Sequence, residues 1–213
     1  MEIARAAAGL FVRQGLKATR AEDIAQAAGI APRTFYRYFA AKEEAIAPLY
    51  EAGARRWVEA VRAAPPGTSV PQALEDAARS MLRPGAGVSS DSWAWVRTLV
   101  RLAHSNPSLR RVWAEVCQTS ERALAEVLAS RVPAGTAADN DAGHADGAAG
   151  ARSAAADARL RFAAAVAIAA IRAAVEGWAA GDGPNEGPQG PAELAVANLA
   201  TLRHFPWDDL TAS

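Results

Sequence analysis

The sequence predicts an all-α protein, and three observations carry this prediction. Apolar residues make up 51% of the 213 residues and are dominated by alanine, the strongest helix former, whereas aromatic residues make up 7%. Apolar residues recur at three- and four-residue spacings along most of the chain, and Gly and Pro gather between the periodic segments. We expect about nine helices.

The first two helices follow from local start and stop signals. Residues 2–14 form an amphipathic helix that Gly15 ends. Thr19 begins the run TRAE, in which its hydroxyl and the Glu22 carboxylate fit a capping box. We therefore expect a short second helix that ends at about residue 28.

A tight turn separates the second helix from the third. Gly29 can adopt the left-handed conformation that ends a helix, and Pro32 suits the first turn of a helix over about 32–38. A long fourth helix is expected over about 40–64, with a bend at Pro48. Further periodic segments predict helices at about 71–83, 91–104, 107–131, 155–180 and 191–204.

Residues 133–153 differ in composition from the rest of the chain. They are mainly Gly, Ala and Asp and carry no large apolar side chain, so they cannot bury enough apolar surface to order themselves. We expect a flexible loop there, inside a larger domain that covers residues 47–213.

The bulk charge excludes some classes of function. The formal net charge is zero, which argues against a chain that coats nucleic acid or an anionic membrane along its whole length. The single cysteine, Cys117, cannot form an internal disulfide, and the first residues do not resemble a secretion signal. Arg172 and Glu176 interrupt the most apolar segment, so no membrane span is expected. These features predict a cytoplasmic protein.

Residues 1–46 have the layout of a helix-turn-helix domain, in which the third helix enters the major groove. Residues 31–42 contain three cations and no acid, as phosphate contact requires. On the third helix, Phe35 and Phe39 share the face expected to pack inward, which leaves the other side chains to point outward. The alternative is an ordinary core helix with a solvated cationic face. The candidate DNA-binding residues are Thr19, Arg33, Thr34, Tyr36, Arg37, Tyr38 and Lys42.

The run GLKATRAEDIAQAAGIAPRTFYRYFAAKEEAI resembles the DNA-binding domain of the TetR family of bacterial transcription regulators. The likeness covers about residues 3–46 and rests on Gly15, Thr19, Ile24, Ala25, Ala28, Gly29, Thr34, Tyr36, Phe39 and Lys42. It implies an all-helical homodimer whose second domain binds a small molecule and so controls operator binding. It also implies that Arg33 and Thr34 lie at the groove edge, and that Tyr36 and Lys42 hold phosphates. Ala31 departs from the family pattern, which has Ser or Thr there, and deprives the third helix of a side-chain cap.

The helix at about 155–180 carries a bulky and a smaller apolar stripe, so it must be covered on more than one side. The smaller stripe, with the last helix, fits a dimer interface, and a central helix in a monomer is the alternative. The candidate interface residues are Phe162, Val166, Ala169, Ala173, Gly177, Leu199 and Leu202.

Residues 95–131 are similar to the TetR subfamily with an acyl-CoA-like ligand-binding domain. This similarity implies a small apolar or acyl-type ligand, with Arg97, Arg101 or His104 available to an anionic head group. The alternative is that the aromatic rows are core packing. The candidate pocket residues are Trp93, Arg97, Val100, Arg101, His104, Trp113, Cys117, Ile171 and Trp178.

Chemistry-bearing motifs are missing from the sequence: it has no metal-ligand spacing, nucleophile elbow or phosphate-binding glycine loop. We therefore expect no enzyme, no cofactor and no metal. The predicted function is a ligand-responsive DNA-binding regulator that acts as a repressor, with double-stranded operator DNA and a small effector as its partners. The alternative is a helical small-molecule-binding protein or enzyme that does not bind DNA.

Overall fold

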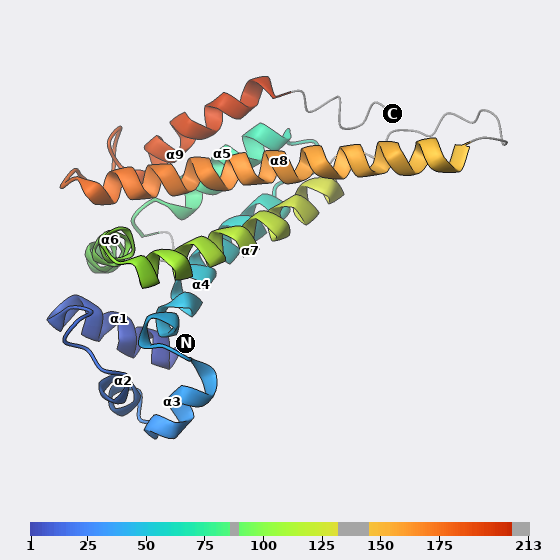
Figure 1. Cartoon of the computed structure of the whole chain (residues 1–213). Helices are drawn as coiled ribbons and strands as arrows, with labels where there is room; N and C mark the ends of the chain where they lie inside the picture. Colours follow the sequence, from blue (N-terminus) through green and yellow to red (C-terminus); the bar gives the residue numbers. More distant parts are fainter. Residues whose placement is uncertain (86–89, 132–144, 206–213) are drawn as a thin grey trace.

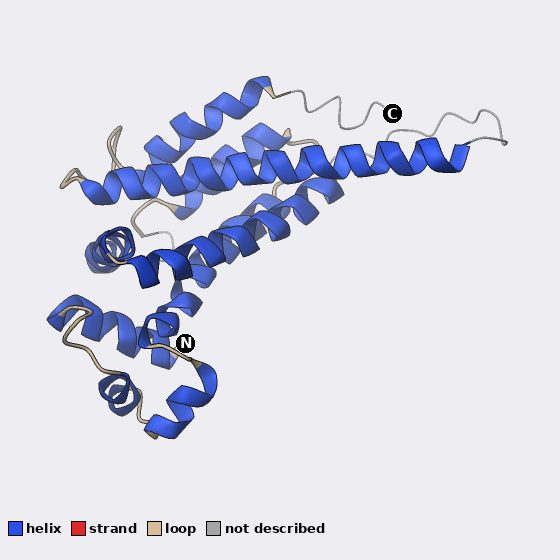
Figure 2. Ribbon diagram, in the orientation of Figure 1, coloured by secondary structure: helices blue, strands red, loops and turns tan. Residues whose placement is uncertain are grey.

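The computed structural model of the chain describes residues 1–85, 90–131 and 145–205 (Figure 1). Within these ranges it consists of nine α-helices and two short 3₁₀ helices joined by loops, and no strand occurs in them (Figure 2). The prediction of an all-α protein with about nine helices is confirmed.

Three short helices form one end of the molecule (Figure 1). They are α1 (Glu2–Gln14), α2 (Ala21–Ala27) and α3 (Pro32–Tyr38), close to the boundaries expected from the sequence. The larger part contains α4 (Ala47–Arg62), α5 (Val70–Met81), α6 (Ser90–Ser105), α7 (Pro107–Arg131), α8 (Ala145–Ala180), α9 (Pro191–Leu199) and the 3₁₀ helix η2 (Ala200–His204).

The prediction that the fourth helix begins at about residue 40 is wrong. The chain first forms the 3₁₀ helix η1 (Lys42–Ile46), and α4 begins only at Ala47. Pro48 therefore lies in the first turn of α4 rather than at an internal bend. A proline is tolerated there because its missing N–H would have no partner within the helix in any case.

The flexible loop predicted for residues 133–153 is also wrong in part. Helix α8 begins at Ala145, so residues 145–153 are helical, and the rest of the predicted loop up to residue 144 lies outside the described residues. A segment rich in alanine has a high intrinsic helix propensity, and it can extend an existing helix without the cost of nucleation.

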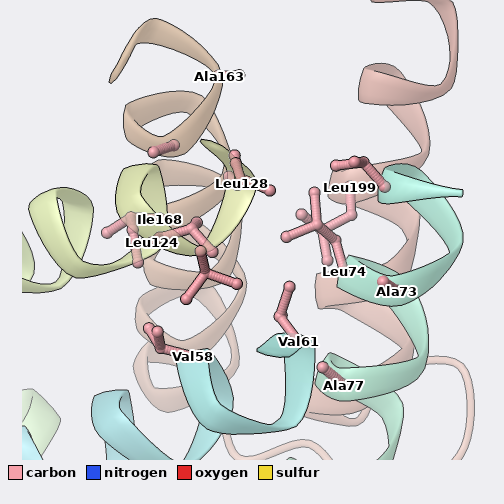
Figure 3. Packing of buried hydrophobic residues seen from close by; sticks show 14 of the residues in the cluster. Val58, Val61, Ala73, Leu74, Ala77, Leu124, Leu128, Ala163, Ile168 and Leu199 are labelled. Carbon is pink, nitrogen blue, oxygen red and sulfur yellow. The ribbon is translucent and has the colours of Figure 1, made fainter. Parts of the chain in front are cut away.

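Five helices of the larger part meet in one hydrophobic core. Figure 3 shows side chains from α4, α5, α7, α8 and α9 directed toward one another, among them Val61, Leu74, Leu124, Leu128 and Leu199. Each of these five is essentially fully buried. Truncation of such a leucine to alanine typically costs about 2 to 5 kcal/mol of stability.

A second core joins the two ends of the molecule. Phe11, Ile24 and Phe35 of the three-helix end pack in one cluster with Leu99 of α6 and Leu109 of α7. The division into residues 1–46 and 47–213 stays a prediction about function, because hydrophobic packing is continuous across it.

Helix α8 is unusually apolar. Over Ala156–Ala180 it is long and apolar enough to cross a membrane by length and composition, so the expectation that Arg172 and Glu176 exclude this is wrong. Of its most apolar window, 44% is buried within the protein. Because α7 and α9 cover it (Figure 1), the burial fits a core helix of a soluble domain.

Candidate functional site

The turn between α2 and α3 is closed by backbone hydrogen bonds. Gly29 has a φ of 68°, in the left-handed region that glycine adopts without strain. The amide of Ile30 donates to the carbonyl of Ala25 at 2.9 Å, which completes the end of α2. This tight turn sets the direction in which α3 leaves α2.

The start of α2 differs from the predicted capping box. The N-cap residue is Arg20, whose backbone N–H donates to the Asp23 carboxylate at 2.8 Å. Thr19 is fully buried, and its hydroxyl donates to the carbonyl of Gly15 at 2.8 Å. The capping box at Thr19 and Glu22 is therefore wrong by one residue, and the assignment of the Thr19 side chain to the DNA-contacting surface is corrected as well, because the hydroxyl braces the loop after α1.

Helix α3 presents the expected faces. Phe35 is fully buried and Phe39 is half-buried, with their ring centroids 5.3 Å apart. Ala31 is the N-cap residue and makes no side-chain bond, as its departure from the family pattern implied. Of the candidate residues on this helix, Arg33, Tyr36, Arg37 and Tyr38 are exposed and Thr34 is half-buried.

Several of the exposed polar groups have partners within the protein. The Tyr36 hydroxyl donates to Oε1 of Glu22 at 3.2 Å. Partial desolvation and the neighbouring Glu22 carboxylate raise the pKa of Tyr36, so the hydroxyl keeps its proton at neutral pH. Arg37 donates to the Tyr38 hydroxyl at 3.2 Å, with its guanidinium 5.0 Å from the Tyr38 ring centroid.

Lys42 has a structural role in the DNA-free chain. Its Nζ donates to the carbonyls of Leu16 and Thr19, both at 2.7 Å. These bonds tie η1 to the loop between α1 and α2. An ammonium has three N–H groups, so one remains for a phosphate.

A cavity of about 430 Å³ lies among α6, α7 and α8. It is lined by Val100, Ala103, His104, Arg110, Trp113, Ala114, Cys117, Glu121, Arg172 and Glu176. Four of these were candidates from the sequence: Val100, His104, Trp113 and Cys117. The sequence analysis missed the charged pair Arg172 and Glu176, although charges four residues apart on an otherwise apolar helix were a visible signal.

Three linked side chains form part of the wall of this cavity. Trp113 Nε1 donates to Oε1 of Glu176 at 2.9 Å, and Oε2 of Glu176 lies 3.4 Å from Nη1 of Arg172. The Trp113 ring meets the Tyr50 ring edge to face, with centroids 4.9 Å apart. Burial raises the pKa of the Cys117 thiol to about 11, so Cys117 is a protonated, unreactive part of the wall.

The remaining pocket candidates lie outside the cavity. Trp93 and Trp178 pack on each other with centroids 5.4 Å apart, and Ile171 is half-buried at the edge of the hydrophobic clusters. Arg97 donates to the carbonyls of Gly181 and Gly183, and Arg101 to those of Ala179 and Gly181. The two arginines therefore cap the C-terminal end of α8, which corrects their assignment to an anionic head group.

The proposed dimer face is open along α8. Phe162 is 59% exposed, Ala173 and Gly177 are exposed, and Val166 and Ala169 are half-buried. Leu199 and Leu202 are buried in the core of their own chain, so their assignment to an interface is wrong. A periodic apolar row on a short helix does not reveal whether its own chain or a partner subunit covers it.

Comparison with known proteins agrees with this geometry. Residues 3–47 match the sequence pattern of the family described as "Bacterial regulatory proteins, tetR family". The HTH-type transcriptional regulator TcmR of Streptomyces glaucescens is 32% identical over 133 residues. That alignment covers 61% of this chain and 58% of TcmR, so this chain spans little more than half the length of its relative.

Two solved structures share the fold over nearly the whole chain. Thermus thermophilus FadR, a TetR-family repressor in complex with lauroyl-CoA, is 20% identical, with a TM-score of 0.59 and coverage of 95% of this chain and 92% of its own. The TetR-family repressor AlkX of Dietzia sp. strain DQ12-45-1b is 17% identical, with a TM-score of 0.60 and coverage of 99% and 98%. Members of this family are DNA-binding regulators, in line with the expectation that the chain is not an enzyme. Residues 3–47 thus match the tetR family of bacterial regulatory proteins, and the chain is similar in sequence to TcmR and in fold to FadR and AlkX.

Proposed function

We propose that this protein is a cytoplasmic, ligand-responsive repressor that binds operator DNA as a homodimer. The observation that carries the proposal is the α3 surface, where Arg33, Tyr36, Arg37 and Tyr38 are exposed directly after the tight turn at Gly29. Cations and hydroxyls on such a helix supply the phosphate and base-edge contacts of a helix-turn-helix protein.

Two copies of α3 are needed to read two half-sites. In a dimer of this class the recognition helices enter major grooves about 34 Å apart. The row of Phe162, Val166, Ala169, Ala173 and Gly177 supports α8 as the contact between subunits, since three of its members are exposed and small residues permit close helix approach. In this proposal the N-terminal 46 residues bind DNA, and the remainder dimerises and senses the ligand.

The cavity among α6, α7 and α8 is the proposed effector site. Its volume of about 430 Å³ falls within the range of roughly 300 to 1,000 Å³ that is typical of small-molecule sites. Val100, Ala103 and Trp113 offer apolar surface, Arg110 and Arg172 offer cationic groups for an anionic head, and the His104 imidazole offers a further hydrogen-bonding group. An acyl-type effector fits this combination, and the lauroyl-CoA complex of FadR is an example within the same fold.

Helix α6 connects this cavity to the DNA-binding end. Val100 and Ala103 line the cavity, while the carbonyl of Leu99 accepts a 3.1 Å hydrogen bond from the buried Tyr50 hydroxyl of α4. A ligand that displaces α6 therefore moves α4 and changes the spacing of the two α3 helices. By linkage, DNA must weaken ligand binding by the same factor, typically about 5- to 150-fold.

An electrophoretic shift on a promoter fragment from beside the protein's own gene tests the proposal. We expect a specific shift that weakens as salt rises, because phosphate contacts release counterions. Arg33→Ala should weaken it, while Arg55→Ala, on an exposed part of α4, serves as the matched control. Tyr36→Phe should weaken all DNA sequences alike, since a phosphate contact carries no base information.

A ligand screen then tests the switch. Saturating acyl-type ligands should release the DNA, and unchanged operator affinity at saturation would refute the proposed response. If the protein bound such ligands but shifted neither its own promoter nor other genomic fragments, the alternative of a helical small-molecule-binding protein would replace the regulator.

A further inference from the structure

Glu22 lies on the DNA-binding surface between two groups that are suited to phosphate. Its Oε1 accepts the Tyr36 hydroxyl at 3.2 Å, and its Oε2 lies 3.5 Å from Nε of Arg20. The Glu22 side chain is 45% exposed and that of Arg20 is 76% exposed. The first turn of α2 thus places a carboxylate next to the exposed face of α3.

The contact with Tyr36 excludes a simultaneous contact with DNA. A phenolic hydroxyl carries one hydrogen, so Tyr36 can donate either to Glu22 or to a phosphate oxygen. The edge-to-face packing of Tyr36 on the buried Phe35 ring, with centroids 5.6 Å apart, restrains the Tyr36 ring on the side of α3 that faces Glu22. The donor is therefore occupied in the DNA-free protein.

Charge acts in the same direction. Glu22 neutralises the guanidinium of Arg20, and a carboxylate beside a phosphate is repelled by it. Asp23, the other acid of this turn, accepts the backbone N–H of Arg20 and so serves the helix start rather than Tyr36. Glu22 is thus the acid of this turn that holds the side chains expected to contact DNA.

We propose that Glu22 is a built-in competitor of the DNA backbone, which occupies Tyr36 and Arg20 in the free protein and must be displaced when DNA binds. This inference rests on the proposed DNA-binding function. Its consequence is a uniform reduction in affinity for every duplex, which suppresses non-specific binding. Only sequences that also make base contacts with α3 then remain bound.

Binding of the full-length protein to two duplexes tests this inference. One duplex has a random sequence, and the other is the promoter fragment. Glu22→Gln keeps the size of the side chain and removes its charge, and Glu51→Gln is the matched control, because Glu51 is an exposed acid on α4.

We expect Glu22→Gln to bind both duplexes about 3- to 10-fold more tightly than the wild type, from the loss of one nearby like charge and one exposed ion pair. The released Arg20 can neutralise a further phosphate, so the slope of log affinity against log salt should steepen by about 0.9. In a Tyr36→Phe background the gain should shrink, because no hydroxyl remains to be released.

Three results would overturn the inference. One is a gain in Glu22→Gln no larger than that in Glu51→Gln. Another is lost discrimination at a single base pair, which would make Glu22 a reader of a cytosine amino group instead. The third is an unchanged Tyr36 titration in Glu22→Gln, followed by NMR of ring-labelled tyrosine without DNA, because loss of the Glu22 charge should lower the pKa of Tyr36.

The same set of measurements separates this inference from the proposed function. If the wild type shifts DNA and Glu22→Gln binds it equally, the role of Glu22 fails alone. If the Tyr36 titration moves but no variant binds either duplex, the contact with Glu22 exists and the DNA-binding function fails, together with the competitor role that rests on it.

Discussion

The ion pair between Glu75 and Arg203 should be a large single contribution to stability in the larger domain. Glu75 lies on α5 and is 1% exposed, and Arg203 of η2 donates to both of its carboxylate oxygens at 2.6 Å. A parallel pair of charged hydrogen bonds is the strongest geometry available to these groups. It fixes the last described turn of the chain against α5.

Arg203→Ala would leave the buried carboxylate without its partner. Removal of one member of a buried ion pair typically costs about 3 to 5 kcal/mol. The Arg203 side chain is 55% exposed, so water replaces part of the lost interaction and we expect a loss near 2 to 3 kcal/mol. This loss is roughly 15 to 60% of the stability of a typical domain, which is about 5 to 15 kcal/mol.

Urea unfolding at fixed protein concentration measures this loss, since the proposed dimerisation would make stability depend on concentration. The midpoint should fall while the slope of the transition stays constant. Arg161→Ala, at an exposed position of α8, should change the free energy of unfolding by less than about 0.5 kcal/mol. A loss in Arg203→Ala no larger than in Arg161→Ala would refute the reasoning, because it would mean that solvent stabilises Glu75 as well as Arg203 does.

Three further predictions concern α3, the proposed dimer face and the cavity. Ala31→Ser should stabilise α3 by about 0.5 to 1 kcal/mol, near the low end for an N-cap because Thr34 N already bonds the Ala31 carbonyl. Slower amide exchange of α3 in Ala31→Ser than in an Ala31→Val control would demonstrate this stabilisation, and equal exchange in the two variants would contradict it. Phe162→Glu should weaken self-association at least tenfold in sedimentation experiments, or about 1.4 kcal/mol, and an unchanged dimer would move the interface off this face. With a pKa raised to about 11, Cys117 should be almost wholly protonated at pH 8 and should react with thiol reagents roughly two hundredfold more slowly than free cysteine. The thiolate is the nucleophile, so the rate of reaction of Cys117 with thiol reagents should rise about tenfold per pH unit up to pH 10. A plateau in this rate below pH 9 would contradict the raised pKa.

Helix positions were predictable where the signals were local. The bounds of α1, α3 and α7 agree with the expected residues because apolar spacing, the stop at Gly15 and the starts at Pro32 and Pro107 act within one or two turns. The capping box failed because Thr19 had a competing partner, the Gly15 carbonyl, that sequence spacing does not reveal. The sequence does not predict the helical start of α8, because a segment without large apolar residues favours disorder by composition, although alanine extends a helix without burial.

The candidate sites were likewise predictable only where local sequence signals determine them. The exposed face of α3 follows from a single helix and its period, and Arg33, Tyr36, Arg37 and Tyr38 are exposed as expected. The assignment of Arg97 to a ligand head group failed because its partners, among them the carbonyl of Gly183, lie 86 residues away along the chain. Contacts between distant segments decide which of two apolar or charged rows faces a cavity.

In the proposed switch, the effector cavity and the DNA-binding end are linked through neighbouring residues of α6. Val100 lines the cavity while the carbonyl of Leu99 accepts the Tyr50 hydroxyl, so consecutive residues face the ligand side and the DNA-binding side of one helix. The Tyr50 ring also packs on Trp113, whose N–H holds Glu176 in the cavity wall. Tyr50 of α4 is therefore in contact with both α6 and α7. Because close-packed interiors change between discrete arrangements rather than deforming continuously, a ligand that repacks Trp113 must also repack Tyr50 and with it the start of α4.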